Sequence, residues 1–125
     1  MIKAWYGHAH PKQYCAFFGG HSLLRQTLAR VERLIPAARL LTVVTQAHMT
    51  YVRQELYDRA PETVIIQPCN RETGAGILLP LLHIVHRDPE AIVALFPSDH
   101  FIRGEARFMA AVATAVASLA THPRH

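Results

Sequence analysis

Apolar residues recur at helical spacing in two places along the first half of the chain. After Ser22, a residue type that caps helix N-termini, they recur near a period of 3.6 and so lie on one helical face. This pattern predicts a helix that Pro36 stops. A more polar segment, 47–59, predicts another helix before Pro61. The apolar positions of the two faces are Leu23, Leu24, Leu28, Val31, Leu34 and Ile35 in the first helix, and Met49, Val52 and Leu56 in the second.

Short apolar runs rich in β-branched residues predict strands. Segments 40–44, 63–66 and 91–96 are runs of this kind, typical of strands buried on both faces in parallel sheets. Segment 14–18 predicts a further short strand or an extended segment, which ends in a turn at Gly19-Gly20.

Two more helices are predicted in the second half of the chain. Thr73 caps the first, which runs through Val85 and contains Pro80, a residue that either bends the helix or marks its true start. The second covers 105–120 and is rich in alanine. Its expected buried residues are Phe108, Met109, Val112 and Val116.

Strands that alternate with helices predict an α/β fold with a mostly parallel sheet and right-handed crossovers. The length suits one domain, 1–125, with an irregular segment at 1–10 and a frayed tail at 121–125.

Composition narrows the class of protein without identifying it. No apolar run approaches the roughly 18–20 residues that cross a bilayer, and the N-terminus has no signal-peptide pattern. We therefore expect a soluble, cytoplasmic protein with no membrane partner. Cys15 and Cys69 form no CxxC pair, which predicts two reduced thiols in that compartment.

The charge distribution argues against nucleic-acid binding. The net charge is +4, from 13 basic and 9 acidic residues, and the arginines are scattered rather than gathered in one block. A mild positive charge also suits small phosphorylated ligands, but the charge alone does not choose among them.

Candidate site residues follow the predicted strands, because ligands of open α/β sheets bind beyond the carboxyl ends of the strands. Segments 67–74 and 97–100 are polar, turn-forming and in that place. Asp99 is suited to hold Mg²⁺ together with water and substrate phosphates, or alternatively to form an Asx turn or a helix cap. Lys12 and Arg71 are suited to contact phosphates, and each could equally be an ordinary surface cation.

Other chemistries have weaker support. The histidine pairs His8/His10 and His83/His86 lack the three or four converging ligands of a zinc site. No GxSxG pattern indicates a serine nucleophile.

Three motifs, taken in order, resemble stretches of the sugar-nucleotide pyrophosphorylases, a nucleotidyltransferase family, and within it of the mannose-1-phosphate guanylyltransferases. The first is Pro11-Lys12-Gln13-Tyr14 with Gly19-Gly20 and Ser22-Leu23-Leu24-Arg25-Gln26-Thr27, the second Gln67-Pro68-Cys69-Asn70-Arg71-Glu72-Thr73, and the third Pro97-Ser98-Asp99-His100. Each motif alone is weak. Their common order, over roughly 11–119, makes the resemblance specific.

The resemblance implies a partial Rossmann-like, three-layer fold of the nucleotide-diphospho-sugar transferase type. It also implies GTP and a sugar 1-phosphate (mannose 1-phosphate) as substrates, Mg²⁺ as cofactor, and GDP-sugar and pyrophosphate as products. The matching residues would be Lys12 as the catalytic phosphate-binding lysine, Gln67, Asn70, Arg71 and Thr73 around the nucleotide, and Asp99 as the first of two metal-binding aspartates.

The chain also departs from the family pattern. The family's glycine-rich triphosphate loop has no counterpart before Pro11, and the second half of the family's catalytic domain, with the second aspartate, has no counterpart either. Two hypotheses follow: a nucleotidyltransferase that holds only part of its site and is inactive alone, or a non-catalytic module that binds a nucleotide or a partner without turnover.

Overall fold

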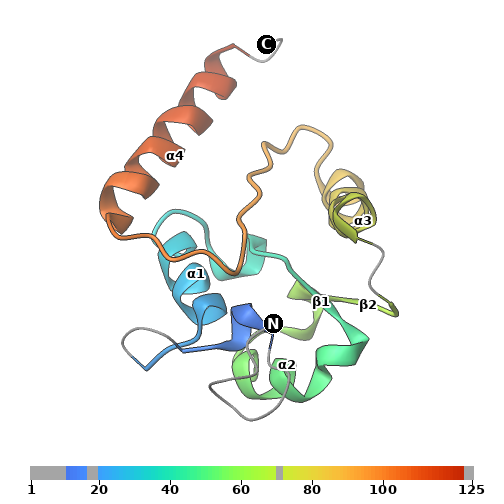
Figure 1. The fold of residues 1–125 in the computed structure, drawn as a ribbon. Helices are drawn as coiled ribbons and strands as arrows, with labels where there is room; N and C mark the ends of the chain where they lie inside the picture. Colours follow the sequence, from blue (N-terminus) through green and yellow to red (C-terminus); the bar gives the residue numbers. More distant parts are fainter. Residues whose placement is uncertain (1–10, 17–19, 70–71, 123–125) are drawn as a thin grey trace. The chain divides into compact units, whose positions relative to one another are not determined.

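The computed structural model describes residues 11–16, 20–69 and 72–122, and within them it forms four α-helices and two β-strands (Figure 1). The predicted irregular segment 1–10 and the end of the predicted tail, 123–125, lie outside the described residues. The chain divides into two compact units. We call Met1–Ile35 with Leu95–His125 the helical unit, and Pro36–Ala94 the sheet unit.

The helical unit is built on α1 (Leu23–Val31) and α4 (Glu105–Thr121). The predicted cap is confirmed, because the Ser22 hydroxyl accepts a hydrogen bond from the backbone N–H of Arg25 at 3.1 Å. The predicted apolar face of α1 is also confirmed up to its last turn. The buried apolar residues of this unit are Tyr14, Cys15, Leu23, Leu24, Leu28, Val31 and Met109.

The helix α1 ends at Val31, earlier than the prediction that Pro36 stops it. The backbone N–H groups of Leu34 and Ile35 both bond to the Val31 carbonyl, so the chain leaves the helix through a tight turn. A residue before proline is disfavoured in the helical region, which explains why the helix does not run up to Pro36.

The prediction of a strand or extended segment over 14–18 is wrong at its first residue. Tyr14 closes a short 3₁₀ helix, η1 (Lys12–Tyr14), in which its N–H bonds to the Pro11 carbonyl at 3.0 Å. Cys15 is extended, and its carbonyl accepts from the N–H of Leu23 at 3.1 Å. Residues 17–19 lie outside the described part of the chain.

The sheet unit contains the predicted parallel sheet in a minimal form. Strands β1 (Thr42–Thr45) and β2 (Val64–Gln67) pair in parallel, in a register from Thr42 opposite Val64 to Thr45 opposite Gln67. The connection runs through η3 (Gln46–His48), α2 (Met49–Glu55) and η4 (Pro61–Thr63). A further 3₁₀ helix, η2 (Ala37–Arg39), precedes β1. Val44, Ile65, Val52 and Leu56 form the buried apolar set.

The third predicted strand, 91–96, does not form. Within the described residues this segment belongs to no β-ladder, and Ile92 and Leu95 are exposed. A strand exists only when another backbone pairs with it, so an apolar run alone cannot make one. The aromatic ring of Phe96 packs edge-on against Phe108 instead, with ring centroids 6.5 Å apart.

The two remaining helices differ slightly from their predictions. Helix α3 (Glu72–Arg87) begins at Glu72, so Thr73 lies inside the helix and does not cap it. Pro80 is accommodated within α3 and marks no new start. Helix α4 matches the predicted span 105–120 to within one residue. Met109 is buried as expected, whereas Phe108, Val112 and Val116, which were also predicted to be buried, are only half-buried. These elements confirm a mixed α/β structure with a small parallel sheet. No helix in the described ranges is both long and apolar enough to cross a membrane.

Candidate functional site

The carboxyl ends of the two strands bring Thr45 and Gln67 side by side, because these two residues are register partners. Gln67 is only 7% exposed. A Cβ atom built on Gly76 of α3 would lie 3.6 Å from the Gln67 side-chain nitrogen, so the start of α3 faces this amide. The predicted nucleotide-binding residue Gln67 therefore lies where a parallel sheet offers a ligand site.

Thr45 is a site residue that the sequence analysis missed. Its hydroxyl oxygen is buried and has no hydrogen-bond partner within the described part of the chain. A buried hydroxyl without a partner is costly, so its position beside Gln67 is a specific feature of this edge. The only signal in the sequence was its place at the end of an apolar run, just before the polar Gln46.

The other predicted nucleotide-binding residues lie around the connection from β2 to α3. Asn70 and Arg71 are outside the described residues. Thr73 lies in the first turn of α3, followed by Gly74, around which a Cβ atom would meet nothing within 4 Å. The free N–H groups of a helix start are suited to an anion. Gln67 and Thr73 thus share the sheet unit and flank one connection.

Lys12 and Asp99 belong to the helical unit. Lys12 is exposed at the first position of η1, while Pro11 and Tyr14 on either side of this turn are buried. This arrangement fixes the backbone of Lys12 and leaves its ammonium group free to meet an anion from solvent.

Asp99 lies in the turn that follows segment 91–96, with its side chain 43% exposed. Its carboxylate Oδ1 is 3.6 Å from Nε2 of His100. Mg²⁺ is bound through one or two carboxylates together with water and substrate phosphates, so an accessible carboxylate fits as one protein ligand. No group of three or more histidine, cysteine, aspartate or glutamate side chains within the ranges described could hold a metal ion.

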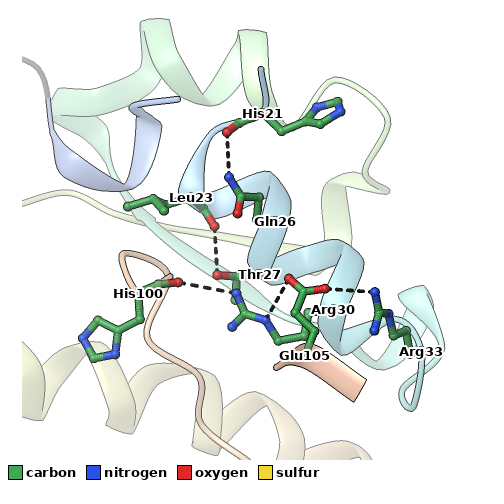
Figure 2. A network of polar contacts seen from close by, with 8 residues as sticks. All are labelled: His21, Leu23, Gln26, Thr27, Arg30, Arg33, His100 and Glu105. Carbon is green, nitrogen blue, oxygen red and sulfur yellow. Dashed lines mark hydrogen bonds and ion pairs between the residues drawn. The ribbon is translucent and has the colours of Figure 1, made fainter. Parts of the chain in front are cut away.

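A polar network around the buried Arg30 includes His100, the residue after Asp99, and was also missed by the sequence analysis (Figure 2). Arg30 of α1 is 2% exposed, and its Nη2 donates to the His100 carbonyl at 3.4 Å. Its Nε lies 3.5 Å from Glu105 Oε1, and Arg33 Nη2 donates to the other Glu105 oxygen at 2.9 Å. Arg30 lies seven residues after Leu23, on the same buried face of the helix. This spacing was the signal in the sequence that could have predicted its burial.

Comparison with known proteins gives the chain its relatives. No protein-family model matches it. It is 30% identical over 112 residues to the xanthan biosynthesis protein XanB of Xanthomonas campestris pv. campestris (strain ATCC 33913), covering 88% of this chain and 24% of that protein. It is 27% identical over 110 residues to mannose-1-phosphate guanylyltransferase 2 of Escherichia coli O157:H7, covering 85% and 23%. The relatives of this chain therefore include mannose-1-phosphate guanylyltransferases.

A third relative supports the same assignment. The alginate biosynthesis protein AlgA of Pseudomonas aeruginosa is 27% identical over 108 residues, which cover 85% of this chain and 22% of AlgA. The resemblance read from the three motifs is therefore confirmed. The chain spans about a quarter of the length of the curated relatives it matches.

Proposed function

We propose that this chain holds part of the nucleotide and metal site of a nucleotidyltransferase that transfers GMP from GTP to a sugar 1-phosphate, with mannose 1-phosphate as the sugar substrate. The observation that carries the proposal is the placement of Gln67 and Thr73 around the carboxyl end of β2, in a chain whose relatives include enzymes named mannose-1-phosphate guanylyltransferase. We also propose that these elements belong to a larger Rossmann-like, three-layer sheet, and that the protein works in the cytoplasm.

The reaction needs positioning and charge neutralisation more than proton transfer. An anionic oxygen of the sugar 1-phosphate attacks the α-phosphorus of GTP and forms a new P–O bond. The bond between the α-phosphorus and the oxygen that bridges it to the β-phosphorus breaks, and pyrophosphate leaves with the electron pair. Cations that meet the phosphates in the transition state lower the barrier of such a step.

Each candidate residue has a proposed role, and for Lys12 and Asp99 the exposure of the side chain supports it. Lys12 would neutralise phosphate charge near the reacting centre, since its ammonium group is accessible from solvent. Gln67, Asn70, Arg71 and Thr73 would bind the nucleotide. Asp99 would hold Mg²⁺, and the bound ion would supply charge neutralisation on the phosphate oxygens.

A non-catalytic module that binds a partner or a nucleotide without turnover is the second candidate. The apolar side chains of Leu78, Leu82 and Val85 recur at helical spacing along α3, and all three are exposed. Exposed apolar surface of this kind is typical of contact surfaces. This observation favours binding rather than catalysis by the chain alone.

A thermal melt of the purified chain tests the proposal, with Mg²⁺ and GTP present or absent and ATP as the control nucleotide. A ligand at about 100 times its Kd should stabilise the folded protein by about 2.7 kcal/mol and raise the melting midpoint. Asp99→Asn should remove the Mg²⁺-dependent part of the shift. Asp88→Asn is the matched control, because Asp88 is an exposed aspartate in another turn.

A pyrophosphate-release assay then separates the two candidates. A shift with turnover supports the enzyme, and a shift without turnover supports the binding module. No cooperative melt, or no shift with Mg²⁺ and GTP, would contradict the proposed nucleotide site and leave only common ancestry with the guanylyltransferases.

A further inference from the structure

Arg30 is the most deeply buried charged group of the helical unit among the described residues, and no role at the site has been assigned to it above. Its guanidinium lies between two elements that follow each other in sequence, the turn that carries Asp99 and the start of α4 (Figure 2). A buried arginine is expensive unless it is paired and hydrogen-bonded, so its contacts must stabilise a specific arrangement.

The contacts of Arg30 reach one end of the turn Pro97–His100. Nη2 donates to the carbonyl of His100 at 3.4 Å, directly after Asp99 in the chain. Nε lies 3.5 Å from Glu105 at the first position of α4, where the positive end of the helix dipole also favours a carboxylate. One guanidinium therefore ties α1 both to the end of the turn and to the helix that follows it.

The other end of the turn is held through an aromatic pair. The Arg30 guanidinium carbon lies 5.8 Å from the centroid of the Phe108 ring, within cation–π range. Phe108 in turn packs edge-on against Phe96, the residue before Pro97, at 6.5 Å between centroids. Arg30 and Phe108 thus fix the backbone on both sides of Asp99, which itself stays half-exposed.

We propose that Arg30 is a positioning residue that holds the turn Pro97–His100 so that the Asp99 carboxylate is presented to a divalent cation. The proposal rests on the proposed function in one respect, the assignment of Asp99 as a metal ligand. Arg30 touches neither substrate nor cation in this assignment, and it acts through the His100 carbonyl and the Phe108 ring.

Arg33 gives a matched control for Arg30. Both arginines pair with the same Glu105, but Arg30 is buried on α1, whereas Arg33 lies in the turn after α1 and is exposed, and its contact at 2.9 Å is to the other carboxylate oxygen. Replacing either arginine by methionine removes one positive charge and keeps a long side chain. Removing the positive charge of an arginine should, through electrostatics alone, strengthen the binding of a divalent metal ion. Weaker metal binding by Arg30→Met would therefore reflect the loss of positioning and not the loss of charge.

The experiment uses the whole chain and two readouts. The first is the backbone order parameter from NMR relaxation at 98–101, which should fall below about 0.6 in Arg30→Met and stay near the unaltered value in Arg33→Met. The second is Mn²⁺ affinity, read from paramagnetic broadening of the Asp99 and His100 signals, which should weaken about tenfold in Arg30→Met only. Phe108→Leu loosens the same turn from its other end and carries the test if Arg30→Met does not fold.

The outcomes separate this inference from the proposed function. If the unaltered protein does not broaden at Asp99 with Mn²⁺, the metal role of Asp99 is wrong, while the order parameters still decide whether Arg30 holds the turn. If Arg30→Met matches Arg33→Met in both readouts, or binds Mn²⁺ more tightly, the positioning role of Arg30 is overturned.

Discussion

Helix α1 of the helical unit and helix α3 of the sheet unit bury their apolar residues to very different extents. In the helical unit, the predicted apolar face of α1 is covered, and Leu24 is 3% exposed. In the sheet unit, the regularly spaced apolar residues of α3 are open to solvent, and Leu78 is 58% exposed. The two helices carry similar sequence patterns, so the difference comes from what covers each helix.

Polar groups show the same contrast. The helical unit pairs its buried arginine, Arg30, with a carboxylate, a carbonyl and an aromatic ring. The sheet unit keeps the Thr45 hydroxyl buried without a partner in the part of the chain that the structure describes. Arg30 Nε makes no hydrogen bond but lies 3.5 Å from the Glu105 carboxylate, whereas the Thr45 hydroxyl has neither kind of partner among the described residues, which leaves it available to a ligand.

The largest expected effect on the free energy of unfolding comes from shortening a buried apolar side chain of α1. Leu24→Ala should lower the free energy of unfolding by about 2–5 kcal/mol, because it removes a fully buried side chain and leaves a cavity. Leu78→Ala, the matched change on α3, should alter it by less than about 0.5 kcal/mol. Urea denaturation followed by circular dichroism measures both values. Equal losses would show that the apolar residues of α3 are covered in solution.

An intermediate effect is expected in the polar network. Glu105→Gln should cost about 1–3 kcal/mol of unfolding free energy, because it leaves the buried Arg30 without its carboxylate. Arg33→Met removes only an exposed pair with the same carboxylate and should cost at most about 1 kcal/mol. The same denaturation curves give both numbers. A larger loss for Arg33→Met than for Glu105→Gln would place the stabilising interaction at the surface.

The smallest expected effect concerns the sheet edge and has the opposite sign. Thr45→Val should leave the unfolding free energy unchanged or raise it by up to about 1 kcal/mol, because the buried hydroxyl it removes has no partner among the described residues. Thr63→Val should lower it by about 1 kcal/mol, because the Thr63 hydroxyl donates to the Ala60 carbonyl at 2.7 Å. Thermal melts of the two variants decide the comparison. A clear loss in Thr45→Val would mean that its hydroxyl is satisfied in solution.

Sequence reasoning performed best where a signal is local. The Ser22 cap, the spacing on α1 and the two runs that became β1 and β2 were all predicted, because each depends on neighbouring residues and on the period of the backbone. The ordered motifs also predicted a resemblance to the guanylyltransferases, which the relatives confirm. The assigned roles of Lys12 and Asp99 remain predictions.

Sequence reasoning failed where a residue depends on distant parts of the chain. Segment 91–96 has the composition of a buried strand, yet forms none in the described structure. Arg30 was noted only as one of the scattered arginines, yet it is buried and contacts residues between 100 and 108. The local sequence does not indicate which backbone will pair with segment 91–96 or which carboxylate will pair with Arg30.

The sequence by itself determined the helical segments, the cap of α1 and the two apolar runs that become β1 and β2, because these follow from local backbone preferences. The order of its motifs also determined the resemblance to the guanylyltransferases. Only the tertiary structure decided which apolar faces are covered, which apolar run stays unpaired among the described residues, and that Arg30 is buried against the His100 carbonyl and the Phe108 ring. Burial and pairing each depend on two surfaces in contact, and a single segment of sequence encodes only one of the two surfaces.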